Sequence, residues 1–183
     1  SNSPAVFIDS SGRAFATDAH TLPSARSQGE PLTGRFNLAA GETFRQVLMA
    51  VDEQKYLLAS DSGYGFIGKF ADMVSRNKNG KALINKPDDK KLHNPMKVAD
   101  VTADWVIAVS NEGRLLVFPA ADLPVMSKGK GNKILNLGTG GAETLIGLSL
   151  MKEGDLLIVN SGKRHVKMKF KDLEHYQGER GRR

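Results

Sequence analysis

The chain repeats itself about every fifty residues, and glycine marks the same place in each copy. With spacings of 51, 51 and 50 residues, one glycine series is Gly29, Gly80, Gly131 and Gly181. A second glycine series in the same register is Gly12, Gly63, Gly113 and Gly162. A hydrophobic series agrees with both, at Leu22, Met73, Leu123 and Leu173. A period of this length is typical of a solenoid, a propeller or a related array, so function is expected on a repeated surface rather than in one pocket.

Each copy opens with two short β-like runs around a turn. The paired runs are 5–8 with 14–16, 56–59 with 66–67, 105–109 with 115–118, and 156–159 with 166–170. Runs of this kind predict four β-hairpins. A further apolar run follows in three copies, at 47–49, 96–98 and 146–148, and no window keeps a helical period. The pattern predicts an all-β fold with propeller-like blades of about four strands each.

We interpret residues 1–183 as a single domain with repeats at about 5–55, 56–104, 105–151 and 152–183. The last copy stops at its basic loop, so the array is expected to be open or truncated within a longer one. The first three residues, Ser1, Asn2 and Ser3, are interpreted as an expression remnant. No apolar run approaches the ~18 residues of a membrane span, so no membrane association is expected.

A glycine-containing basic loop follows each hairpin. We call these the first loop (26–35), the second loop (76–81), the third loop (127–133) and the fourth loop (177–183). Glycine lets the backbone approach a surface and expose its N–H groups, and flanking Lys and Arg neutralise phosphates. One such loop alone is more simply a solvated turn, but four in register favour a nucleic-acid partner.

The charge of the chain is uneven. The formal net charge is +6, which favours a polyanionic partner. Residues 1–55 hold 5 basic and 6 acidic groups, whereas residues 152–183 hold 9 basic and 5 acidic groups. The basic surface is therefore expected to strengthen toward the C-terminus, with the first loop nearly uncharged.

The expected phosphate contacts are the basic side chains of the second, third and fourth loops. They are Arg76, Lys78, Lys81, Lys128, Lys130, Lys133, Arg180, Arg182 and Arg183. Basic residues of the fourth hairpin are expected to extend this surface, namely Lys163, Arg164, Lys167 and Lys169. Binding through such contacts is predicted to depend strongly on salt and weakly on sequence.

The loops resemble degenerate versions of the gyrase box, the Gln-Arg-Arg-Gly-Gly-Lys-Gly element found in the C-terminal domain of the bacterial gyrase A protein. The topoisomerase IV branch of this family, from gammaproteobacteria, is the more similar one. The stretches that carry the resemblance are 21–26, 28–34, 59–66, 127–133 and 178–183. No loop holds the full box, so wrapping of DNA as strong as in gyrase is not expected.

The resemblance implies a β-pinwheel, whose blades exchange strands, with duplex DNA bound on a basic outer rim. The implied role is non-catalytic: the domain would set substrate-topology preference in decatenation and supercoil relaxation, while the catalytic tyrosine lies in another domain. No cofactor is implied here, since ATP and Mg²⁺ act in other domains of the holoenzyme. The implied partners are DNA, the rest of the topoisomerase IV heterotetramer and a chromosome condensin, in the bacterial cytoplasm at the nucleoid.

Two other classes of function compete with DNA binding. A propeller-type interaction module would dock a protein such as condensin without direct DNA contact, but its Trp-Asp signature is missing because Val106 follows Trp105. An enzyme with a central-channel active site would need convergent carboxylates or histidines at repeat positions. The four histidines occupy unrelated repeat positions, and the absence of cysteine removes thiolate ligands, so neither a catalytic nor a metal site is predicted.

Overall fold

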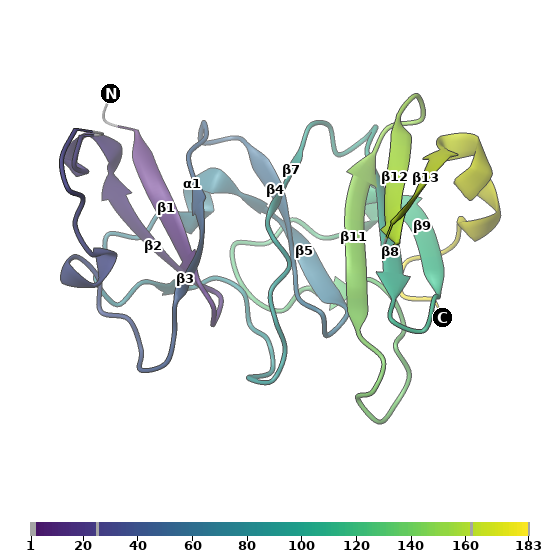
Figure 1. Cartoon of the computed structure of the whole chain (residues 1–183), viewed down its shortest axis with the longest axis horizontal. Helices are drawn as coiled ribbons and strands as arrows, with labels where there is room; N and C mark the ends of the chain where they lie inside the picture. Colours follow the sequence, from purple (N-terminus) through teal and green to yellow (C-terminus); the bar gives the residue numbers. More distant parts are fainter. Residues whose placement is uncertain (1–2, 25, 162, 183) are drawn as a thin grey trace.

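The four predicted hairpins are confirmed in the computed structural model, which describes residues 3–24, 26–161 and 163–182. They are β1–β2 (Pro4–Asp9, Arg13–Asp18), β4–β5 (Lys55–Ala59, Tyr64–Lys69), β8–β9 (Trp105–Ser110, Leu115–Pro119) and β12–β13 (Leu156–Ser161, Arg164–Lys169). We call the sheets built on these hairpins blades 1 to 4. Figure 1 shows blades 1 to 3 following one another along the long axis, with β12–β13 drawn over blade 3 at the end away from β1–β2.

One edge of each of the first three blades is formed by the apolar run that closes its own repeat. These strands are β3 (Phe44–Leu48), β7 (Met96–Val98) and β11 (Leu145–Met151), which pair antiparallel with β1, β4 and β8. The sequence prediction of a further strand after each basic loop is thereby confirmed for three repeats.

The opposite edge is built by strand exchange between repeats. The two short strands β6 (Lys81–Ala82) and β10 (Asn132–Lys133) follow the hairpins of blades 2 and 3, yet they pair with β2 and β5 of the preceding blades. Gln177 likewise forms a bridge with Val117 of β9. The resulting sheet orders are β3-β1-β2-β6, β10-β5-β4-β7, β11-β8-β9 and β12-β13.

Helices are short and serve as connectors. They are η1 (Ala19–Thr21), η2 (Leu32–Gly34), α1 (Phe70–Met73), η3 (Ala120–Asp122) and η4 (Phe170–Tyr176). The hydrophobic series of the sequence lies in or directly after four of these helices, and its side chains pack them against the blades. Met73, Leu123 and Leu173 are buried, and Leu22 is half-buried. Each buried side chain fixes the start of the loop that follows it.

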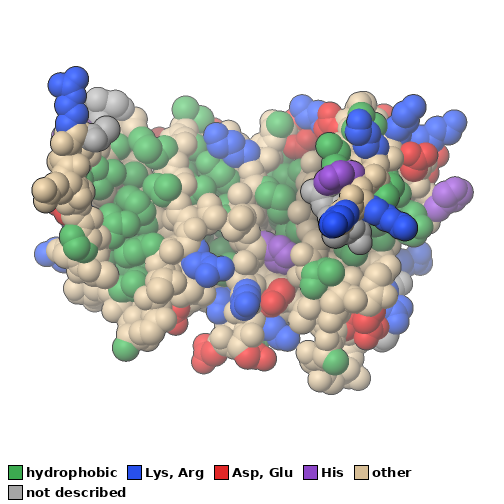
Figure 2. All heavy atoms as spheres, viewed as in Figure 1, with side chains coloured by type: hydrophobic (Ala, Val, Ile, Leu, Met, Phe, Trp, Pro, Cys, Tyr) green, Lys and Arg blue, Asp and Glu red, His purple; other side chains and the backbone are tan. Residues whose placement is uncertain are grey.

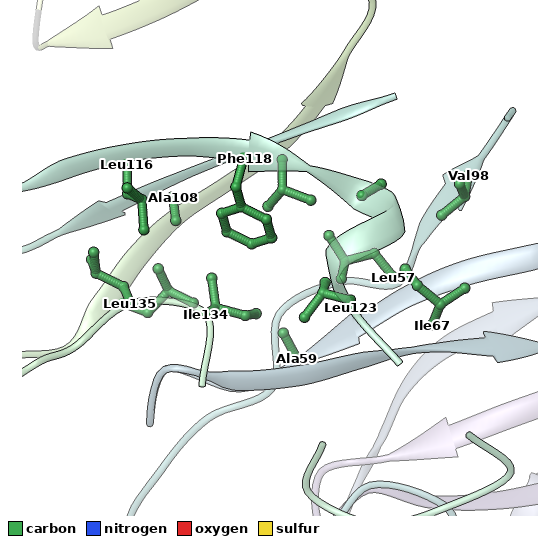
Figure 3. Packing of buried hydrophobic residues seen from close by; sticks show 13 residues of the cluster. Leu57, Ala59, Ile67, Val98, Ala108, Leu116, Phe118, Leu123, Ile134 and Leu135 are labelled. Carbon is green, nitrogen blue, oxygen red and sulfur yellow. The ribbon is translucent and has the colours of Figure 1, made fainter. Parts of the chain in front are cut away.

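The core lies between successive blades rather than inside any one of them. Residues alternate between the two faces of a strand, so Leu58 and Phe66 pack toward blade 1 while Leu57 and Ile67 pack toward blade 3. Figure 3 shows the second of these interfaces, where Phe118 meets side chains from the facing strands. Burial on both faces explains why the hairpin strands read as continuous apolar runs.

Aromatic rings pack both on the outer face of blade 1 and between blades 3 and 4. The free face of blade 1 is closed by a cluster of the aromatic rings Phe7, Phe15, Phe36 and Phe44. Between blades 3 and 4, Trp105 lies against Phe170 with ring centroids 5.0 Å apart. No helix in the described part of the chain has the length and apolar character needed to cross a membrane.

Candidate nucleic-acid interface

Strand exchange places the second loop on blade 1 and the third loop on blade 2, although these loops follow the hairpins of blades 2 and 3 in the sequence. The second loop runs into β6 on the edge of blade 1, where Arg13 donates from Nε to the Asn79 carbonyl at 2.9 Å and from Nη2 to the Gly80 carbonyl at 3.1 Å. The third loop runs into β10 on blade 2. The fourth loop begins beside β9 of blade 3, where the Gly178 N–H donates to the Val117 carbonyl at 3.0 Å.

The loops are joined to one another by backbone hydrogen bonds at three equivalent places. In each, the N–H of an asparagine that follows one loop donates to a carbonyl of the next loop. The pairs, with donor–acceptor distances, are Asn37 to Lys78 at 2.8 Å, Asn85 to Gly129 at 3.0 Å and Asn136 to Arg182 at 2.9 Å. The four loops therefore form one continuous row, which we call the loop row.

The glycines of the loop row serve the fold. The Gly129 N–H donates to the Leu83 carbonyl at 3.0 Å, and the Gly181 N–H donates to the Ile134 carbonyl at 2.9 Å. The sequence interpretation that these glycines expose their N–H groups to a ligand is wrong for both, because strand exchange uses the donors. The exposed basic side chains of the loops do remain available to a ligand.

The third loop presents the most open positive charge. Lys128 and Lys130 are exposed and Lys133 is half-buried. The Lys130 Nζ lies 4.5 Å from the centroid of the Tyr64 ring, a cation–π arrangement that orients the side chain on the blade edge. The loop itself contains no acidic residue.

The second and fourth loops use part of their charge internally. Arg76 and Lys78 are exposed, whereas the Lys81 Nζ donates to the Asp72 carbonyl. In the fourth loop, Arg182 is exposed, and Arg183 lies outside the described residues. Across the described ranges, no basic residue of these three loops forms an ion pair with a carboxylate.

Arg180 is held as a clamp between two loops. Its half-buried guanidinium donates from Nε to the Asp122 carbonyl at 3.0 Å and from Nη1 to the Lys133 carbonyl at 2.6 Å. The sequence predicted a phosphate contact at this position. The geometry gives Arg180 an additional task that the sequence did not indicate, namely fixing the end of the third loop.

This geometry predicts that Arg180→Ala lowers stability by about 1–2 kcal/mol, because two carbonyls lose a charged donor. Urea unfolding measures that change, and hydrogen exchange at Asn136 and Gly181 reports whether the loops loosen. Arg182→Ala is the matched control, since Arg182 is exposed in the same loop. Unchanged stability in the Arg180 variant, with the control equal to it, would contradict the clamp.

The first loop joins the row with little free charge. Arg35 pairs with Glu30 and donates from Nη1 to Thr21 Oγ1 at 2.8 Å. Arg26 and Gln28 are exposed. These contacts agree with the expectation that the first loop is nearly uncharged.

None of the described basic loops pairs with the fourth hairpin, which contains the other four predicted residues. Lys167 and Lys169 of β13 pair in register with Ile158 and Leu156, whose side chains are 58% and 55% exposed. The residues that occupy the position of Lys167 in blades 2 and 3 are Ile67 and Val117, and both are fully buried. Figure 2 shows Lys and Arg side chains gathered at the end of the molecule that carries β12 and β13. Lys163 and Arg164 are exposed at and beside the hairpin turn.

Titratable groups with shifted pKa values lie away from the loop row. Burial raises the pKa of the Tyr56 hydroxyl in β4. Hydrogen bonds from the Thr102 side chain and backbone lower the pKa of the Asp100 carboxyl. Among the described residues, no three His, Asp or Glu side chains converge as a metal site requires.

Comparison with known proteins finds relatives with the same arrangement of blades. A family model described as the DNA gyrase C-terminal domain, beta-propeller, matches residues 104–150. The solved C-terminal domain of Escherichia coli ParC shares 47% identity with the chain at a TM-score of 0.93, over 100% of this chain and 76% of that one. The chain belongs to the family of ParC-type C-terminal domains of topoisomerase IV. The resemblance noted in the loops and the expected β-pinwheel fold are both confirmed.

Two further relatives set the limits of the match. The A subunit of DNA topoisomerase 4 from Haemophilus influenzae is 50% identical over 187 residues, which cover 100% of this chain and 25% of the relative. The solved DNA gyrase A C-terminal domain shares the fold at a TM-score of 0.68 and 16% identity, over 99% of this chain and 58% of that one. The chain thus spans about a quarter of its full-length relatives, which are parts of a larger complex.

Proposed function

We propose that this chain binds duplex DNA through the phosphate backbone along the loop row. The observation that supports this most directly is the row itself, in which exposed lysines and arginines without carboxylate partners are held at fixed places by inter-loop hydrogen bonds. Phosphate contacts of this kind give affinity without reading base sequence. Backbone exchange between blades supplies the rigidity that such a surface needs.

The proposed role is that of a non-catalytic accessory domain in a type IIA topoisomerase. Family membership supports it, since the full-length relatives are A subunits of topoisomerase 4. In this role the loop row would hold a DNA segment near the rest of the heterotetramer. That placement would set which DNA topology is preferred in decatenation and relaxation.

The test is duplex affinity as a function of salt, with linear, positively supercoiled and negatively supercoiled DNA compared. We expect a steep linear fall of log affinity with log salt, with a slope of about −0.9 for each phosphate neutralised. A difference between the supercoiled forms would support the topology role. A flat salt response would reject DNA binding and favour a protein-docking module.

A further inference from the structure

A hollow of about 280 Å³ opens between the turn of the first hairpin and the segment that follows the second loop. Its polar lining consists of Ser11, Arg13, Asn85 and Lys86, and no Asp or Glu lines it. The Leu83 and Ile84 N–H groups both donate to the Gly12 carbonyl, at 3.1 and 2.9 Å, which joins the two walls. The hollow is therefore a positively charged recess built by strand exchange.

Arg13 is fixed at the wall of this hollow. Its Nε and Nη2 are occupied by the Asn79 and Gly80 carbonyls, as described above. Within the described residues, its Nη1 donates no hydrogen bond to the protein, so the guanidinium is oriented and still has free donors. Lys86 is half-buried beside it and pairs with no carboxylate of the described chain.

The hollow lies at the junction of the second and third loops. The Asn85 N–H donates to the Gly129 carbonyl at 3.0 Å, and Gly129 lies between Lys128 and Lys130 in the sequence. A ligand that contacts these two lysines would therefore pass next to the opening. Neither Arg13 nor Lys86 belongs to a basic loop.

The next blade contains the same hollow in a filled form. The residues one repeat later are Tyr64 for Arg13 and Leu137 for Lys86, each 51 positions further along. There Leu137 packs against the turn: its Cδ1 lies 3.0 Å from the place that a Cβ on Gly63 would occupy. The chain thus fills this space with leucine in one blade and lines it with lysine in the other.

We propose that Arg13, Asn85 and Lys86 form a phosphate-binding site that takes one phosphodiester group of bound DNA between the second and third loops. A tetrahedral anion suits the recess because its donors are two cationic groups and an amide, and no Asp or Glu lines it. The Asp9 carboxylate is buried behind the turn, where its Oδ1 accepts hydrogen bonds from the Ser11 hydroxyl and the Arg13 N–H. Lys86 also lines a neighbouring hollow that contains Glu42 and Asp88. The site rests on the proposed DNA binding and adds a contact to it. It also makes blade 1, whose own loop is nearly uncharged, part of the interface.

The deciding variant is Lys86→Leu, which copies the filled hollow of blade 2. We expect the slope of log affinity against log salt to become shallower by about 1, as for one lost phosphate contact. Lys86→Gln keeps the hollow open without the charge and is expected to give the same change. Lys97→Ala, at an exposed lysine of β7 on the opposite edge of the sheet from β10, is the control and should leave the slope unchanged.

Each outcome separates the site from DNA binding in general. If the wild-type slope is steep and both Lys86 variants keep it, the hollow is not a DNA contact, although the loop row still binds. If the wild-type slope is flat, DNA binding itself fails. Inorganic phosphate at constant ionic strength tests the other source of the anion: phosphate binding that is lost in Lys86→Gln, with a DNA salt slope unchanged by the same substitution, would assign the site to free phosphate instead.

Discussion

Replacing Gly131 with alanine is expected to destabilise the protein by about 3 kcal/mol or more. Gly131 has φ +78°, a conformation that disfavours any Cβ by roughly 1–2 kcal/mol. A Cβ there would also overlap the Gly65 carbonyl oxygen, a backbone atom of blade 2. The backbone must then separate β10 from β5, and such forced shifts cost typically about 1–3 kcal/mol. Urea or thermal unfolding measures the loss.

A matched control isolates the clash from the backbone conformation. Gly140 has φ +99°, but no heavy atom lies within 4 Å of the position that its Cβ would take. Gly140→Ala should therefore show only the conformational penalty, of roughly 1–2 kcal/mol. Equal destabilisation by the two variants would mean that contact between the third loop and blade 2 does not require glycine.

This expectation bears on how far the sequence predicts the fold. The fifty-residue period and the continuous apolar runs predict hairpins such as β4–β5, because a strand that is buried on both faces needs hydrophobic residues throughout. Strand exchange was not visible in the same way. The partner of Asn132 and Lys133 is a strand about 70 residues earlier, and two residues carry no periodic signal. Only the family resemblance indicated the exchange.

The candidate interface was likewise predicted only in part from the sequence. Composition located the loops and their charge, since lysines around glycine can be read from one segment alone. It could not tell which basic groups are spent inside the fold: Arg180 and Lys128 look alike in sequence, yet one clamps two carbonyls and the other is exposed. Arg13 and Lys86 were missed because they lie outside the loops. The signal that could have found them is their position in the repeat, where they correspond to Tyr64 and Leu137 of the next blade.

The loss of DNA affinity should be largest when charge is reversed in the third loop. Lys128→Glu with Lys130→Glu is expected to weaken duplex binding roughly 10- to 100-fold near 0.1 M salt, and to make the salt slope shallower by about 2. The third loop is chosen because its charge is open. The second loop uses Lys81 on a backbone carbonyl, and the fourth loop uses Arg180 as a clamp and contains Glu179.

Lys167→Glu with Lys169→Glu is the matched control, because it changes the net charge by the same amount on the fourth hairpin. Long-range attraction falls equally in both variants, so the difference between them reports local contact. We expect the hairpin variant to lose much less affinity, since none of the described basic loops pairs with that hairpin. Equal losses would move the interface toward blade 4. Stability must be compared too, because losing the Lys130–Tyr64 contact costs about 0.5–1 kcal/mol, too little to unfold the protein and mimic lost binding.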